Sequence, residues 1–193
     1  MKDTAFATNE ATWYSRLLRG EIKTSAQRGV EFGFAEDREF ECWLREHSNE
    51  FSWIYVEQEV QATRDDHRLA FVSRKGDIIG YLKIALDDAY VLDYDRHVSL
   101  PKGFFFIQDT FVLPQFRKMG IARSMISNAM LSLQTRGYER AFCHIPSWNV
   151  ASRRTYETLG FKPVGHITFR MIFGKKIYSL APEELIGKIH HRG

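Results

Sequence analysis

The chain has 193 residues, of which 44% are hydrophobic, and its 27 basic and 24 acidic side chains give a net charge of +3. This length can bury one substantial core, so a single domain is expected. The small, interspersed charge excess argues against a nucleic-acid-binding protein, and no apolar run approaches the roughly 20 residues that span a bilayer. The N-terminus lacks the apolar stretch of a signal peptide and there are only two cysteines, so the cytoplasm is the expected location.

The first third of the chain gives the weakest signals. Residues 1–26 are expected to form an N-terminal lead-in, with a short helix over 10–18. Residues 28–35 alternate apolar and polar side chains, as a half-buried strand does. A helix is predicted over 37–47 because Asp37 is a suitable cap, and a weaker helical pattern follows over 51–61.

The middle of the chain has clearer patterns. Residues 68–74 and 77–86 predict two strands joined by the turn Lys75-Gly76. The acidic and aromatic segment 87–102 is predicted to be a loop. Residues 103–114 form the most strand-like run of the sequence.

The last third alternates helices and strands. The pattern predicts a helix over 121–133, a strand over 139–145, a helix over about 150–159, and strands over 164–173 and 175–180. Three strands in a meander followed by two strand–helix units imply an α/β fold. Its mixed, mainly antiparallel sheet should have about seven strands, with helices on both faces.

The junction between the strand at 103–114 and the next helix has the chemistry of a phosphate site. The first N–H groups of a helix have no internal partner and lie at the positive end of its dipole. Gly120 has no side chain to keep a phosphate from the backbone, and Arg117 and Lys118 add positive charge. One glycine and two basic residues are also common at ordinary helix starts, and Pro114 could simply end a strand.

The run from Val112 to Ala122, V-L-P-Q-F-R-K-M-G-I-A, resembles the acetyl-CoA signature R/Q-x-x-G-x-G/A of the GNAT acyltransferases. The resemblance implies that backbone amides of residues 118–123 bind the pyrophosphate of acetyl-CoA. It also implies that the preceding strand pairs with the pantetheine arm, and that a bulge near Val112 frees an amide to polarise the thioester carbonyl. The cofactor-binding residues expected here are Phe111, Val112, Leu113, Arg117, Lys118, Met119, Gly120, Ile121, Ala122 and Arg123.

A second segment, from Asn149 to Phe161, resembles the N-x-x-[SA]-x-x-x-Y-x-x-x-G-F pattern of the same family. Asn149 and Tyr156 are about two helical turns apart, so both can face one cleft, and Ser152 lies on the same side. The resemblance implies that Asn149 contacts the pantetheine, with Ser152 beside it, and that Tyr156 protonates the leaving thiolate. A phenol suits this task because it keeps its proton at neutral pH. Taken alone, Tyr156 would favour the interpretation of a half-buried tyrosine bonded to water over a catalytic role.

The general base is harder to predict. A primary amine is mostly protonated at pH 7, so a carboxylate, a histidine or a water must help to remove a proton. Asp109, in I-Q-D-T-F-V, is similar to the acid of the I-E-D-[LF]-[FY]-V strand in GNAT enzymes related to the polyamine acetyltransferases. Gln108 replaces the first acid of that pair, which argues against strongly cationic acceptors. A structural carboxylate that accepts backbone N–H groups is an equal interpretation of Asp109.

Other polar residues carry weaker predictions. Adjacent strand residues point to opposite faces, so Cys143 and His144 are poorly arranged to share a proton. A buried, inert Cys143 is favoured, and His144 remains an alternative for the cleft. The acidic side chains of the 87–102 loop could rim an amine-binding mouth or simply be solvated; they are Asp87, Asp88, Asp93 and Asp95.

These patterns together predict a GNAT domain over residues 27–182, followed by a tail over 183–193 that could be helical. The expected reaction is transfer of an acetyl group from acetyl-CoA to a primary amine by direct attack in a ternary complex. The alternative is a GNAT-like module that binds acyl-CoA without turnover. No metal is expected because the seven histidines are scattered, without C-x-x-C or H-E-x-x-H spacing. The expected partners are a CoA ester and an amine, and the apolar face of 164–173 would suit a homodimer contact.

Overall fold

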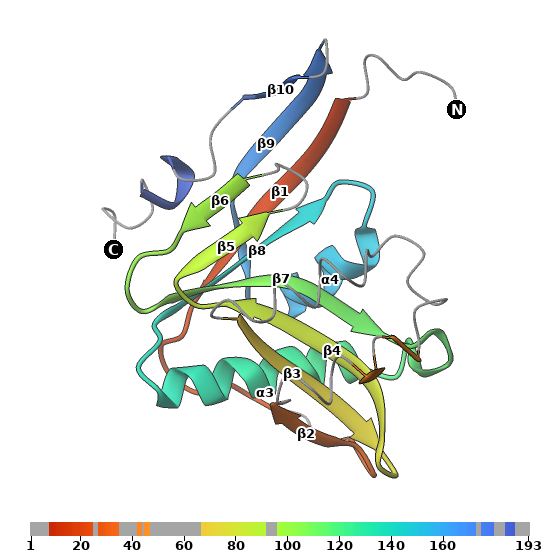
Figure 1. Cartoon of the computed structure of the whole chain (residues 1–193). Coiled ribbons are helices and arrows are strands. Elements are labelled where there is room, and N and C mark those ends of the chain that lie inside the picture. Colours follow the sequence, from red (N-terminus) through yellow and green to blue (C-terminus); the bar gives the residue numbers. More distant parts are fainter. Residues whose placement is uncertain are drawn as a thin grey trace.

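The computed structural model describes residues 8–24, 27–34, 42–43, 45–46, 67–91, 96–172, 175–179 and 184–187. These residues form one eight-stranded sheet, in the order β10-β9-β1-β8-β7-β4-β3-β2, and a separate hairpin (Figure 1). The sheet strands are β1 (Thr8–Leu17), β2 (Glu31–Phe34), β3 (His67–Arg74), β4 (Asp77–Ala85), β7 (Phe104–Val112), β8 (Arg140–Pro146), β9 (Lys162–Ile172) and β10 (Lys175–Tyr178). Neighbouring strands are antiparallel except β7 and β8, which are parallel. The predicted mixed, mainly antiparallel sheet is therefore confirmed.

Two longer helices follow β7 and β8. A short 3-10 helix, η3 (Pro114–Phe116), leads into α3 (Ile121–Thr135), and α4 (Val150–Thr158) connects β8 to β9. Residues 42–43, 45–46 and 184–187 are also helical. The predicted helix over 51–61 lies outside the described residues. None of the helices described is long and apolar enough to cross a membrane.

The two faces of the sheet carry different cores. On one face, Phe105 and Ile107 of β7 pack with the buried side of α3 and with Tyr156 of α4. On the other face, Phe104 and Phe106 pack with Trp13 and with the hairpin of β5 (Asp88–Val91) and β6 (Arg96–Ser99). Because the side chains of β7 alternate between the two faces, successive polar residues on this strand are reached from opposite sides of the sheet.

The first strand corrects the sequence prediction. Residues 8–17 form a strand between β8 and β9, whereas a helical lead-in was expected over 10–18. Ala11, Tyr14 and Leu18 recur at helical spacing, but Trp13 is completely buried as well. Pairing with two strands that lie more than a hundred residues away overrides this local pattern.

The segment 87–102 is a second correction. It contains β5 and β6 rather than a loop, and Ala89, Val91 and Val98 are buried against the sheet. Asp88 of this hairpin is hydrogen-bonded to His97, while Asp93 and Asp95 lie outside the described residues. The hairpin therefore covers the face of the sheet opposite α3.

Candidate active site

Strands β7 and β8 separate in the middle of the sheet (Figure 1). Their parallel pairing begins at Phe104 with Arg140 and ends at Ile107 with Cys143. Strand β7 nevertheless stays paired with β4 as far as Val112. From Gln108 onward, no strand of the described residues pairs with the β8-facing edge of β7, and an extended ligand with amide groups could pair there.

A β-bulge lies where this separation begins. Lys83 of β4 is opposite Asp109, and the next residue, Ile84, is opposite Ile107, so Gln108 is the extra residue. A bulge turns backbone groups out of the ladder. The family resemblance led us to expect the bulge near Val112, but it lies upstream, at Gln108. The pairing of Val112 with Gly80 is regular. A side chain on Gly80 would approach the Phe111 carbonyl oxygen to 2.7 Å, so glycine permits this close pairing.

The turn before α3 gathers backbone N–H groups. Lys118 and Gly120 have left-handed backbone angles, with φ of 62° and 77°. The first intrahelical bond runs from the Ser124 N–H to the Gly120 carbonyl, so the amides of residues 121–123 precede the helical ladder. Successive amides in such a turn and at a helix N-terminus make an anion-binding concavity. The geometry fits a pyrophosphate.

Arg117 fixes this turn to the end of β7. Its Nε donates a hydrogen bond of 2.9 Å to the Val112 carbonyl, and its guanidinium lies 5.4 Å from the centre of the Phe111 ring. The guanidinium thereby holds the turn in place, a role that the sequence did not indicate. Lys118 and Arg123 are exposed beside it.

The apolar residues expected to bind the cofactor are mostly buried. Phe111, Val112, Leu113 and Ile121 are each at most 8% exposed, so only their backbone could contact a ligand. The Leu113 N–H already donates to the Ile79 carbonyl, at 3.0 Å. Ala122 is half-buried and Met119 is 50% exposed.

Helix α4 begins at the matching end of β8. Asn149 is its N-cap, and its side-chain oxygen accepts a hydrogen bond of 3.1 Å from the Ser152 N–H. The side-chain NH₂ of Asn149 remains a potential donor toward a ligand. Because β7 and β8 are parallel, the N-termini of α3 and α4 lie at the same edge of the sheet.

Tyr156 projects from α4 toward the open stretch of β7. Its side chain is 4% exposed and its hydroxyl lies 2.8 Å from the Thr110 hydroxyl. Burial raises the pKa of the Tyr156 phenol well above its usual value, and Cys143 and Asp109 add to this, whereas the hydrogen bond with Thr110 lowers it. Tyr156 is consequently protonated at neutral pH. Thr110 stands where the family pattern has Leu or Phe, a signal that could have revealed this partner.

Asp109 lies on the opposite side of β7 from Thr110. One carboxylate oxygen accepts a hydrogen bond of 2.5 Å from the Tyr81 hydroxyl, and the other accepts one of 2.7 Å from the Thr110 N–H. Lys83, which is 5% exposed, is the cross-strand neighbour of Asp109. Asp109 therefore belongs to a polar group on the face away from α3, and the sequence did not predict Tyr81 or Lys83 as members.

Cys143 and His144 point to opposite faces, as the alternation of β8 predicts. Cys143 is buried in the core under α3, and burial raises the pKa of its thiol well above the usual value. His144 stacks on Phe106 at 5.8 Å, on the face that carries Asp109. A shared proton between Cys143 and His144 is thus incompatible with the structure. In the part of the chain that the structure describes, no cluster of three His, Cys, Asp or Glu residues could hold a metal.

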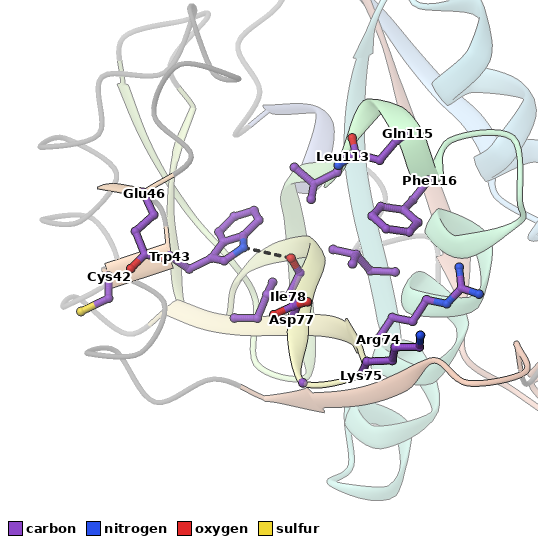
Figure 2. Close-up of a pocket in the computed structure, with 12 residues that line it drawn as sticks. Cys42, Trp43, Glu46, Arg74, Lys75, Asp77, Ile78, Leu113, Gln115 and Phe116 are labelled. Carbon is purple, nitrogen blue, oxygen red and sulfur yellow. Dashed lines mark hydrogen bonds between the residues drawn. The ribbon is translucent and has the colours of Figure 1, made fainter.

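A hollow lies beside this site rather than in it. It has a volume of about 750 Å³ and lies between the helical residues 42–43 and 45–46, the β3–β4 turn and η3 (Figure 2). Trp43 closes one side, and its indole N–H donates a hydrogen bond of 3.0 Å to the Ile78 carbonyl. Leu113 is its only described lining residue among the predicted site residues. Neither Asp109 nor Tyr156 lines this hollow.

The comparisons with known proteins agree with this geometry. Residues 32–161 match the Acetyltransferase (GNAT) family, which is more than half of the chain. The chain belongs to the GNAT acetyltransferase family. The match includes the turn at 117–122 and the segment from Asn149 to Phe161, so the resemblance predicted from these motifs is confirmed. No curated protein matches the sequence significantly.

Solved structures share the fold of this GNAT protein at low sequence identity. A GCN5-related N-acetyltransferase from Sphaerobacter thermophilus matches with a TM-score of 0.65 and 13% identity, over 89% of this chain and 55% of its own. The ribosomal-protein-S18-alanine N-acetyltransferase from Escherichia coli has a TM-score of 0.57 and 13% identity, over 72% and 80%. AAC(6')-Iy, in complex with the bisubstrate analog CoA-S-monomethyl-acetylneamine, has a TM-score of 0.55 and 20% identity, over 70% and 92%. The chain spans 55% to 63% of the first solved structures that it matches.

Proposed function

We propose that this GNAT protein transfers an acetyl group from acetyl-CoA to a primary amine by direct attack in a ternary complex. The observation that carries the proposal is the convergence of three features at one edge of the sheet. These are the gap between β7 and β8, the amide-rich turn before α3, and the Tyr156 hydroxyl beside that gap. The gap would bind the pantetheine, the turn would bind the pyrophosphate, and the Tyr156 hydroxyl would protonate the leaving thiolate.

The donor would be held mainly by the backbone. The amides of residues 118–123 would bind the pyrophosphate, with Lys118 and Arg123 supplying charge at the exposed rim. The open edge of β7 would pair with the amides of the pantetheine, and the Asn149 side chain would donate from the other side of the gap. The thioester would then lie near the bulge at Gln108, where a backbone N–H could polarise its carbonyl.

Tyr156 would then act as the general acid. When the amine nitrogen bonds to the thioester carbon and the C–S bond breaks, the departing sulfur takes the phenolic proton. Of the two ways in which the hydroxyls of Thr110 and Tyr156 can bond, only donation by Thr110 leaves the phenolic proton free for the sulfur. Donation by Thr110 also stabilises the phenolate that remains. We therefore assign Thr110 a positioning role toward Tyr156.

Asp109 would receive the amine on the other face. Its carboxylate accepts hydrogen bonds from Tyr81 and from the Thr110 N–H, and a carboxylate has about four acceptor positions. The ionised carboxylate only accepts hydrogen bonds, so it would attract an ammonium group or orient a water that removes the amine proton. The buried Lys83 beside it would discriminate against acceptors with several positive charges.

The proposal is tested by calorimetry with acetyl-CoA, followed by a thiol-release assay over a panel of primary amines. We expect saturable binding of one acetyl-CoA per chain, and thiol release that depends on the amine. Binding without turnover on any amine would favour the non-catalytic acyl-CoA module. Absence of binding to any CoA ester would contradict both functions.

A further inference from the structure

The sheet has a second opening, at the end of β1 that lies far from the candidate active site. The last pair between β1 and β9 joins Ser15 to Lys162, whereas β1 continues beside β8 as far as Leu17 and Arg140. Strand β9 starts too late to cover the last residues of β1. The resulting cavity, here called the β1 notch, has a volume of about 420 Å³.

The charged lining of the β1 notch is entirely basic among the residues that the structure describes. These side chains come from β1, from the segment that follows it, and from the first residues of β8 and β9; they are Arg16, Arg19, Arg140 and Lys162. Residues distant in the sequence therefore bring positive charge to one small hollow. The described chain places no carboxylate in its lining.

The two inner arginines are held by neutral partners. Arg16 donates to the Leu159 carbonyl at the end of α4. Arg140 donates a hydrogen bond of 3.3 Å to the Ser15 hydroxyl, and its guanidinium lies 5.5 Å from the centre of the Phe104 ring. In the described part of the chain, neither forms an ion pair with a carboxylate. The positive charges are thus ordered without a counter-charge.

This arrangement is electrostatically unfavourable when the notch holds only solvent. Burial lowers the pKa of Arg16, and burial followed by the charge of Arg19 lowers the pKa of Arg140. The Nε of Arg140 is buried, and it has no hydrogen-bond partner in the described structure. A buried donor without a partner and several crowded cations both cost free energy, which a bound anion would relieve.

We propose that the β1 notch binds a small molecule through a phosphate group. A phosphate carries up to two negative charges, and its tetrahedral oxygens can accept bonds from several directions, as cations on three strands require. A planar, singly charged carboxylate would leave part of this charge unmatched. The volume of the notch lies within the range of small-molecule sites, which favours a compact ligand over an extended polyanion. This site does not depend on the proposed acetyl transfer.

The experiment is a calorimetric titration of inorganic phosphate into the protein saturated with CoA. We expect one saturable phosphate site per chain and much weaker binding of acetate. The variant Arg19→Ala/Lys162→Ala removes two exposed cations, so it should fold normally and weaken phosphate binding by about tenfold or more. The control Lys23→Ala/Arg74→Ala removes the same charge from exposed positions outside the notch and should bind like the wild type.

Several results would overturn the proposal. One is non-saturable phosphate binding, or equal weakening in both double variants, since either would reflect general surface charge. Another is phosphate binding that occurs in the CoA-free protein and is lost in the CoA-saturated protein, because the phosphate would then lie in the cofactor cleft. Acetate that binds as tightly as phosphate would refute the phosphate assignment. Binding of a single-stranded RNA without binding of phosphate would replace the small-molecule site by a nucleic-acid surface.

Discussion

The two halves of the candidate site are built from different parts of the protein. The donor half, made of residues 117–123, the open edge of β7 and α4, presents mainly backbone amides supplied by two continuous segments. The acceptor half, made of Tyr81, Lys83, Asp109 and His144, presents side chains that three strands bring together. A donor shared by a whole family can be bound by backbone geometry, whereas an individual acceptor must be selected by side chains. Substitutions in the donor half should therefore affect the reaction with every amine alike, whereas substitutions in the acceptor half should change the ranking of the amines.

The largest effect is expected for Tyr156→Phe. Loss of the general acid should lower kcat by about 10²- to 10⁴-fold with every amine, and should leave the Kd for acetyl-CoA unchanged. The matched control is Tyr14→Phe, which removes a hydroxyl that donates to Glu157 at 3.1 Å. Steady-state kinetics on both variants decide the matter, and a Tyr156→Phe enzyme with wild-type kcat would remove Tyr156 from the mechanism.

A large effect on donor binding is expected for Gly120→Ala. The new Cβ would occupy a left-handed position at the pyrophosphate turn, 3.1 Å from the Gln27 side-chain nitrogen. Strain of about 1–2 kcal/mol, together with a displaced amide, should raise the Kd for acetyl-CoA by about tenfold to a hundredfold. Gly137→Ala introduces the same strain at φ of 89° with open space around it. Calorimetry should show weaker binding for Gly120→Ala alone; equal effects would indicate a general loss of stability.

A smaller effect is expected for Thr110→Val, which keeps the shape of the side chain and removes its hydroxyl. Without this donor, kcat should fall by about tenfold, since one hydrogen bond to a charged group is lost, and the KM for acetyl-CoA should not change. The pKa of Tyr156 should rise further, because the Thr110 hydrogen bond lowers it. Tyrosinate absorbance, measured as the difference from the Tyr156→Phe counterpart, reports this shift.

Thr110→Ser is the control because it restores a hydroxyl. It should recover most of the lost kcat and return the Tyr156 titration toward that of the wild type. A Thr110→Val enzyme with wild-type kcat would mean that the hydroxyl has no role. Equal losses in Thr110→Ser and Thr110→Val would mean that the hydroxyl alone does not account for the loss, which would contradict the positioning role of its hydrogen bond.

The smallest and most selective effect is expected for Asp109→Asn. Loss of the negative charge should lower kcat/KM for amines by about threefold to tenfold and change their ranking, while acetyl-CoA binding is retained. Asp77→Asn, at an exposed position at the start of β4, is the control. An equal loss for all amines, accompanied by weaker acetyl-CoA binding, would assign Asp109 to the structure of β7 rather than to the acceptor.

The same contrast explains what could be predicted from the sequence. The turn at Gly120 and the cap at Asn149 depend on neighbouring residues, so their chemistry is visible in a short window. Strands β3, β4, β7 and β8 were likewise predicted within a few residues of their observed bounds. These elements lie within the part of the chain that the family match covers, and β7 carries the open edge of the donor half.

The acceptor half, together with the strand and the hairpin that pack on the same face of the sheet, depends on pairings that no short window contains. Trp13 is buried because β1 lies between β8 and β9, and its local pattern gave a helix instead. The hairpin of β5 and β6 is stabilised by packing on Phe106 and Phe142, which its acidic sequence conceals. The contact between Tyr81 and Asp109 needs the register of β4 and β7, which the bulge at Gln108 shifts by one residue. Register of this kind is set by tertiary packing.

A single-turnover experiment tests most directly whether the amine attacks acetyl-CoA itself, with Tyr156 as the general acid and without a covalent intermediate. Equal amounts of protein, acetyl-CoA and an amine found active in the panel are mixed and quenched at intervals, and free thiol, acetylated amine and protein mass are measured together. Thiol and acetylated amine should appear in equal amounts, only when the amine is present, with no change in the mass of the protein. Thiol release without amine, with one acetyl group retained on the protein, would contradict direct transfer.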